Sequence, residues 1–145
     1  LWIVLVSQWF GTTKIAGSIG PDFPAFYTGG HLARTGEYSN LYNFERQQQL
    51  QQKWKINQRP DDISAWVHPP HSALLMAPFS SLEPRAAYAI YSVLLILCFA
   101  LGLWILRRQC PQLQKSKFHL LWLLALICPP VYYSISAGQN TGWMF

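Results

Sequence analysis

The sequence predicts an all-α, multi-pass integral membrane protein, and three neighbouring segments carry this prediction. Residues 86–106 form a run of 21 residues without a charge. A helix of that length spans roughly 31 Å, close to the thickness of the hydrocarbon core of a bilayer. The next segment, residues 107–117, carries four cations and no acid, and a second apolar run follows at residues 118–137.

The cation-rich segment predicts the orientation in the membrane. Short loops rich in Lys and Arg stay in the cytoplasm, so we expect residues 107–117 to be cytoplasmic and residues 11–85 to lie outside the plasma (cell inner) membrane. Residues 1–10 are apolar and are interpreted as the end of a first span. A signal peptide is the alternative, but these residues have no basic flank and no cleavage-like site. Residues 138–145 are expected to be an outer turn and the start of a next segment, which makes the chain an internal piece of a larger protein.

Composition supports the membrane class and excludes a nucleic-acid partner. Only 12% of the residues are charged, about half of the share in soluble domains. Four of the eleven bases lie in residues 107–117, and the other seven are nearly balanced by six acids. The net charge of +5 therefore indicates topology and not a surface for polyanions. Three cysteines give no disulfide framework and are interpreted as packing residues.

The outer segment, residues 11–85, is too long for a plain connector and should contain short helices. We expect one helix to begin at Pro24, close to Asp22. Asn43 is expected to cap a second helix over residues 44–56. A short apolar helix over residues 73–79 should dip into the outer edge of the membrane.

Two local patterns mark the ends of the predicted spans. Ser80 and Glu83 have the spacing of a capping box, and Pro84 suits the first turn of the spanning helix. The tandem Pro129-Pro130 should break the second apolar run near the middle of the membrane. Twenty residues beyond Phe118 correspond to about 30 Å of helix, so the chain should return to the outer face just before Gln139.

Asp22 is the most informative candidate for acid–base chemistry. It lies in GPDFPAFY, crowded by aromatic residues and prolines beside the predicted first span. Desolvation and a partner there could tune a carboxylate to act as a general base. An ordinary solvated turn aspartate is the alternative.

The other polar candidates suit phosphate or sugar binding. Arg34 offers a guanidinium that matches phosphate oxygens. His68 and His71 flank two prolines, which favours a stiff turn facing an anion over a helical metal site, so no metal site is predicted. Gln139 and Asn140, between two glycines, could bond sugar hydroxyls or a phosphate, and a plain polar turn is the alternative.

The order of these motifs resembles the N-terminal part of glycosyltransferase family 87, whose members are multi-pass enzymes of the GT-C class. The resemblance extends over residues 11–142. The matching positions are Asp22, Phe23, Tyr27, Leu41, Tyr42, Arg46, Gln47, Pro69, Pro70, Gly138, Gln139 and Asn140. The chain departs from the pattern at His68, where the family is expected to have an aromatic residue, usually Tyr.

The resemblance implies a hexosyltransferase that acts at the outer face of the membrane. It would transfer a hexose, expected to be mannose, from a polyprenyl-phosphate sugar to a lipid or glycan acceptor, with inversion. It implies that Asp22 is the catalytic base, and that Tyr27, Arg34, His68, His71, Gln139 and Asn140 bind substrate or donor. No cofactor is expected, and dependence on a divalent metal stays open. A transporter component and a non-catalytic membrane scaffold are the alternatives, because broken helices also occur in transporters.

Overall fold

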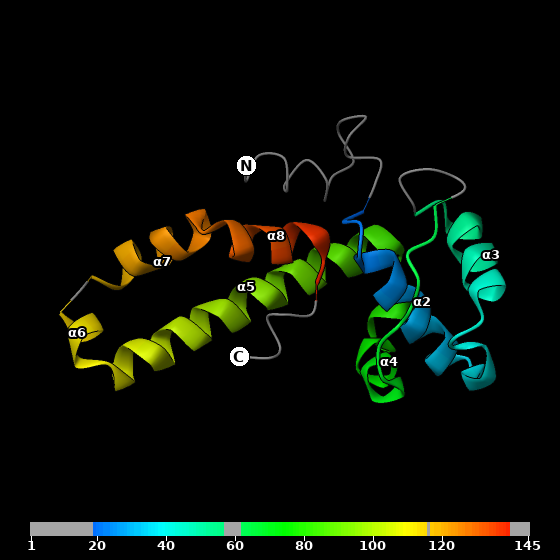
Figure 1. The fold of residues 1–145 in the computed structure, drawn as a ribbon, viewed down its shortest axis with the longest axis horizontal. Helices are drawn as coiled ribbons and strands as arrows, with labels where there is room; N and C mark the ends of the chain where they lie inside the picture. The colour runs from blue at the N-terminus through cyan, green and yellow to red at the C-terminus, as the bar shows by residue number, and fades with distance from the viewer. Residues whose placement is uncertain (1–18, 57–61, 116, 140–145) are drawn as a thin grey trace. The chain divides into compact units, whose positions relative to one another are not determined.

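The computed structural model describes residues 19–56, 62–115 and 117–139, and every regular element among them is a helix (Figure 1). The predicted all-α class is confirmed for this part of the chain. The chain divides into two compact units, Leu1–Tyr91 and Ser92–Phe145. The proposed first-span segment, residues 1–10, and Asn140 lie outside the described residues.

Helix α2, Phe23–Arg34, is the central element of the first unit. Ten of its twelve residues are buried, and α3 and α4 both pack against it (Figure 1). Pro24 lies in its first turn, where the missing N–H costs no hydrogen bond. The helix therefore begins one residue before the predicted start. A helix buried on nearly all sides holds its flanking residues in fixed positions.

Two adjacent glycines let other segments approach α2 closely. A Cβ atom at Gly30 would lie 2.5 Å from the carbonyl oxygen of Met76, the last residue of α4, Pro70–Met76. A Cβ atom at Gly29 would overlap the ring of Trp66. These positions require glycine because any side chain would displace backbone or a fully buried indole.

Helix α3, Phe44–Trp54, confirms the predicted cap. The side chain of Asn43 accepts a hydrogen bond from the backbone N–H of Arg46 at 3.1 Å. The predicted end at residue 56 is wrong by two residues, because Lys55 adopts the left-handed conformation with φ 53°. This conformation ends the helix and turns Ile56 into the interior, where its side chain is buried.

The segment that leads into the long helix differs from the predicted capping box. Helix α4 is followed by the short η3, Phe79–Ser81, and then by α5, Pro84–Gln109. Glu83 caps α5, because its carboxylate accepts the N–H of Ala86 at 3.2 Å. Ser80 instead donates to the carbonyl of Ala77 at 2.8 Å. The predicted helix over residues 73–79 begins three residues earlier, at Pro70.

Helix α5 is long and apolar enough to cross a membrane, as predicted for residues 86–106. In the second unit it is followed by α6, Pro111–Gln114, α7, Phe118–Ile127, and α8, Pro129–Ala137. Phe118–Ala125 of α7 and Pro129–Ala137 of α8 are bent by 65° relative to one another, which fits either one broken span or a re-entrant loop. The break falls at Pro129, as the sequence predicts, since a proline in a helix interior removes a hydrogen bond and clashes with the preceding turn.

Candidate functional site

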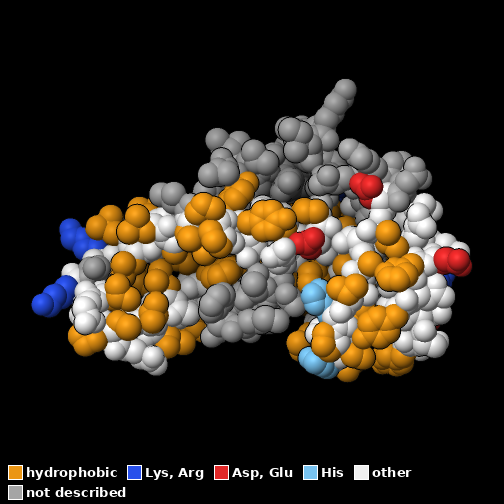
Figure 2. Space-filling model, in the orientation of Figure 1, with side chains coloured by type: hydrophobic (Ala, Val, Ile, Leu, Met, Phe, Trp, Pro, Cys, Tyr) orange, Lys and Arg blue, Asp and Glu red, His pale blue; other side chains and the backbone are white. Residues whose placement is uncertain are grey.

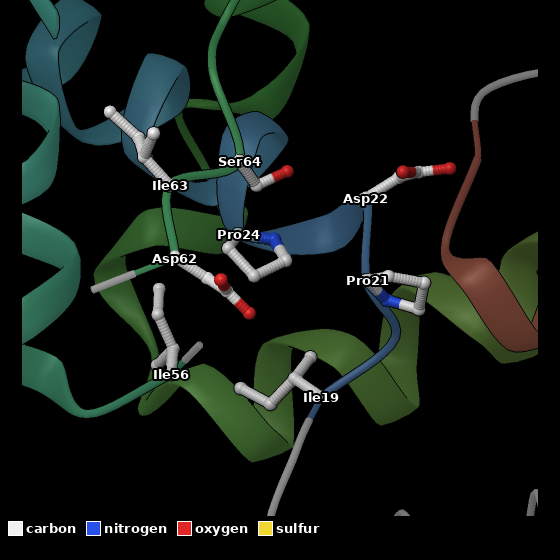
Figure 3. Close-up of a pocket in the computed structure, with 8 residues that line it drawn as sticks. All are labelled: Ile19, Pro21, Asp22, Pro24, Ile56, Asp62, Ile63 and Ser64. Atoms are coloured by element: carbon white, nitrogen blue, oxygen red, sulfur yellow. The ribbon is translucent and has the colours of Figure 1, made fainter. Parts of the chain in front are cut away.

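A pocket of about 300 Å³ lies at the N-terminal end of α2 (Figure 3). Its walls come from the residues before and at the start of α2, from the end of α3, and from the segment that follows residue 61. The lining residues are Ile19, Pro21, Asp22, Pro24, Ile56, Asp62, Ile63 and Ser64. The pocket thus combines aliphatic and proline walls with two carboxylates and one hydroxyl.

Asp22 lies at the edge of this pocket, at the position that precedes α2. Its backbone carbonyl accepts the N–H of Ala25 at 3.2 Å, while its side chain makes no capping hydrogen bond. The side chain is half-buried, and in Figure 3 its carboxylate points away from Asp62. The buried α2 therefore fixes the backbone of Asp22 without using the carboxylate as a cap.

Asp62 is a pocket residue that the sequence analysis did not single out. In Figure 3 its carboxylate points into the pocket, between Ile56 and Pro21. From the sequence, Asp62 belongs to Arg-Pro-Asp-Asp, which is typical of a turn. The sequence feature that could have pointed to Asp62 is that it directly follows another acid, Asp61, and lies two positions before Ser64.

Two fully buried glutamines of α3 hold the pocket wall in place. The Gln51 amide donates to the carbonyl of Ser64 at 2.8 Å and accepts the N–H of Ser64 at 3.1 Å. The Gln47 amide oxygen accepts the N–H of Trp66 at 2.7 Å. Both glutamine side chains thus satisfy backbone groups of the extended segment around Ser64 and hold that segment beside α3.

The same helix explains two further positions of the family resemblance. Gln47 also donates to the carbonyl of Leu41 at 2.8 Å. Arg46 forms a bidentate ion pair with Glu37, in which both N–O distances are 2.9 Å. The hydrogen bond from Arg46 lowers the pKa of the Glu37 carboxyl group. In this structure both side chains fix the turn before α3.

Tyr27 is buried and uses its hydroxyl within the protein. The hydroxyl donates to the carbonyl of Leu82 at 2.8 Å, just before α5. Its ring packs edge-on against Trp54, with centroids 5.0 Å apart. Burial raises the pKa of the Tyr27 hydroxyl. In this structure the Tyr27 hydroxyl links α2 to the residues just before α5.

Arg34 lies at the opposite end of α2 from Asp22. Twelve residues of helix separate the two by about 18 Å. Its guanidinium donates to the Ser80 hydroxyl at 3.1 Å and to the Ser80 carbonyl at 3.3 Å. Burial and the neighbouring Arg34 lower the pKa of His31. The structure therefore brings Arg34 to η3 and not to the pocket of Asp22.

The side chain of His68 packs against two aromatic rings. Its ring stacks on Phe26 with centroids 4.8 Å apart and an interplanar angle of 23°, and it meets Trp66 edge-on at 5.2 Å. The imidazole thus packs among aromatic rings at the position where the family resemblance predicts an aromatic residue. His71 is exposed in the first turn of α4. Within the described residues, no group of three His, Cys, Asp or Glu side chains suits a metal ion.

Gln139 lies in the second unit, after the end of α8. Gly138 adopts the left-handed conformation with φ 72°, and the N–H of Gln139 donates to the carbonyl of Ser134 at 2.9 Å. This is the usual end of a helix at a glycine. The side chain of Gln139 is half-buried. The predicted partner of Gln139 in donor binding, Asn140, lies outside the described residues.

The described residues combine one helix that is long and apolar enough to cross a membrane with a pocket lined by two aspartates. A family model, glycosyltransferase family 87, matches residues 66–145, which is more than half of the chain. The chain therefore belongs to glycosyltransferase family 87, which makes it a glycosyltransferase by family. No curated protein and no solved structure gives a significant match.

The matched residues contain part of the candidate set. His68, His71, Gln139 and Asn140 fall within residues 66–145. Asp22, Tyr27 and Arg34 precede them. The family assignment therefore rests on residues 66–145, and the pocket at the start of α2 is known from the structure alone.

Proposed function

We propose that this chain belongs to a membrane enzyme that transfers a hexose, mannose in the first instance, from a polyprenyl-phosphate sugar to a lipid or glycan acceptor at the outer face of the membrane. The observation that carries the proposal is the pocket at the start of α2, lined by Asp22 and Asp62, in a chain of glycosyltransferase family 87. Transfer proceeds with inversion and needs no cofactor.

Asp22 acts as the general base in this proposal. Its carboxylate takes the proton of an acceptor hydroxyl while the oxygen attacks the anomeric carbon of the hexose. The bond from that carbon to the phosphate oxygen breaks, and the polyprenyl phosphate departs as an anion. Support comes from the placement of Asp22, which is half-buried, lines the pocket and directly precedes the buried helix α2. Such positioning is what a base needs to meet the attacking hydroxyl.

Asp62 and Ser64 bind the acceptor sugar in this proposal. Carboxylates accept hydrogen bonds from sugar hydroxyls, and a serine hydroxyl both donates and accepts. The paired hydrogen bonds between Gln51 and the backbone of Ser64 hold this wall rigid. The acceptor is therefore oriented before the proton is removed.

The leaving phosphate needs cationic or amide groups and not a protonating acid. We assign this role to His71, whose ring is exposed, and Gln139 and Asn140 are assigned to it from the sequence motif alone. Tyr27, which is buried, and His68, which is half-buried, contribute by supporting this unit. Arg34 is assigned to donor binding at the η3 end of α2, because its hydrogen bonds to Ser80 hold the guanidinium there.

The donor class is tested with the full-length protein in purified form. We expect radiolabelled hexose to pass from a polyprenyl-phosphate hexose to a membrane acceptor. The same hexose supplied as a nucleotide sugar should not be transferred, because the protein would need a different site for the nucleotide. Transfer from the nucleotide sugar alone would contradict the proposed donor.

The proposed orientation is tested by labelling of single cysteines in the full-length protein, in a background without Cys98, Cys110 and Cys128. A cysteine at Gln49, which is exposed on α3, should react with an impermeant maleimide in intact cells. A cysteine at Gln112, exposed on α6, should react only after the cells are permeabilised. The reverse pattern would exclude action at the outer face.

A further inference from the structure

The second unit carries positive charge that no acidic side chain of the unit neutralises. The sequence contains no Asp or Glu after Glu83. Arg107 and Arg108 end α5, and Lys115 and Lys117 precede α7. Because no residue from Ser92 to Phe145 is acidic, these cations give this stretch a net positive charge that favours an anion.

An apolar groove of about 430 Å³ begins beside these cations. It follows α5 from Phe99 to Gln109, a distance of about 15 Å along the helix. Side chains of α7 and α8 form its other wall. The lining residues are Phe99, Gly102, Leu103, Ile105, Leu106, Gln109, Trp122, Ala125 and Val131. Gln109 is the single polar residue of this lining, so the groove suits a hydrocarbon chain.

The cationic loop is tied to the end of the groove. Gln114 donates through its amide to the carbonyl of Arg108 at 2.9 Å, and Arg107 donates to the carbonyl of Gln114 at 3.2 Å. Lys115 directly follows Gln114, so it lies near the end of α5, where Gln109 closes the groove. Figure 2 shows cationic side chains gathered at the α6 end, with hydrophobic side chains beyond them.

Aromatic residues mark the same end of the unit. The guanidinium of Arg108 lies over the ring of Trp104 at 5.0 Å from its centroid. Trp122 lines the groove, five residues after Lys117. Tryptophan beside Lys and Arg is typical of the headgroup level of a bilayer. The cationic end of the groove therefore suits that level.

We propose that this groove binds an anionic phospholipid, with one acyl chain along α5 and the phosphate held by Lys115 and Lys117. The charge selects the occupant: an anionic headgroup complements a segment of four cations, whereas a zwitterionic lipid brings no net negative charge to it. Basic residues next to apolar helices are a recurrent setting for anionic headgroups. The site lies in the second unit and is separate from the pocket of Asp22.

The test uses the full-length protein in bilayers with trace spin-labelled phosphatidylglycerol or phosphatidylcholine, which share the same acyl chains and the same nitroxide position. The fraction of immobilised probe gives the association of each lipid with the protein. Wild type should select phosphatidylglycerol. Lys115→Gln with Lys117→Gln should lower that selectivity by about fivefold for each lysine removed, while Lys53→Gln with Lys55→Gln, on exposed residues of the first unit, should not.

A second variant fills the groove. No atom lies within 4 Å of a Cβ placed at Gly102, so the side chain of Gly102→Leu starts in open space. It should abolish the immobilised phosphatidylglycerol signal, whereas Gly102→Ala should retain it. Equal immobilisation of both lipids by wild type would overturn the proposal. So would selectivity that survives Gly102→Leu, or that the two lysine pairs lower equally.

Discussion

Replacement of Asp22 by Asn should reduce the turnover of the full-length enzyme by at least roughly a hundredfold, since a general base typically contributes 10²- to 10⁴-fold. Asparagine keeps the size of the side chain but cannot take the acceptor's proton. The Michaelis constant for the polyprenyl-phosphate sugar should stay close to the wild-type value, because the donor does not use this charge. The measurement is the initial rate of radiolabelled hexose transfer in membranes.

Glu45→Gln is the matched control for this variant. Glu45 is an exposed carboxylate in the first turn of α3, so its loss removes the same charge from the same unit, outside the pocket. The Glu45 variant should transfer hexose within about twofold of wild type, as expected for a surface change. If Asp22→Asn also stays within a few-fold of wild type, then Asp22 is an ordinary turn residue and the base lies elsewhere.

The second large effect concerns the contact between α2 and α4. Gly30→Val should lower the free energy of unfolding by about 3 kcal/mol, the upper end of the range for overpacking. The reason is that even the Cβ atom would lie 2.5 Å from the Met76 carbonyl oxygen and 2.6 Å from its carbon. Backbone cannot rotate away as a flexible side chain does. The melting temperature of the solubilised full-length protein, followed by circular dichroism, should fall by several degrees.

Gly102→Val supplies the control for this effect. It makes the same chemical change within a helix, at a position where no atom lies within 4 Å of the added Cβ. Its unfolding free energy should change by no more than about 0.5 kcal/mol. Equal destabilisation by both variants would mean that loss of glycine itself, and not the close approach of α4, determines the result.

Local patterns in the sequence predicted most of the helices correctly. An uncharged run of 21 residues has few alternatives to a long helix, and Pro129-Pro130 has no place in a helix interior. Asn43 caps α3 as expected because the cap depends on atoms only three residues apart. The end of α3 was missed, since the left-handed conformation of Lys55 depends on burying Ile56 and not on a glycine signal.

The pocket was harder to predict because its walls come from three separate segments. Asp22 was identified from its local surroundings. Asp62 was not singled out, because the segment that carries it is brought to α2 and α3 by contacts between distant residues, such as the paired hydrogen bonds of Gln51 with Ser64 and the bond of Gln47 with Trp66. A polar glutamine on a helix carries no sequence signal that it will be buried. The separation of Arg34 from Asp22 likewise follows from the length of α2, which the sequence left open.

The central claim is that Asp22 removes a proton and makes no bond to the sugar. The anomeric configuration of the transferred hexose tests this most directly, because one direct displacement inverts the anomeric carbon and a covalent intermediate on a carboxylate leads to retention. Product formed by the full-length enzyme from a polyprenyl-phosphate hexose of known configuration is isolated and its anomeric carbon examined by nuclear magnetic resonance. Inversion is the predicted result. Retention of the donor's configuration would contradict the account and would make Asp22 a candidate nucleophile.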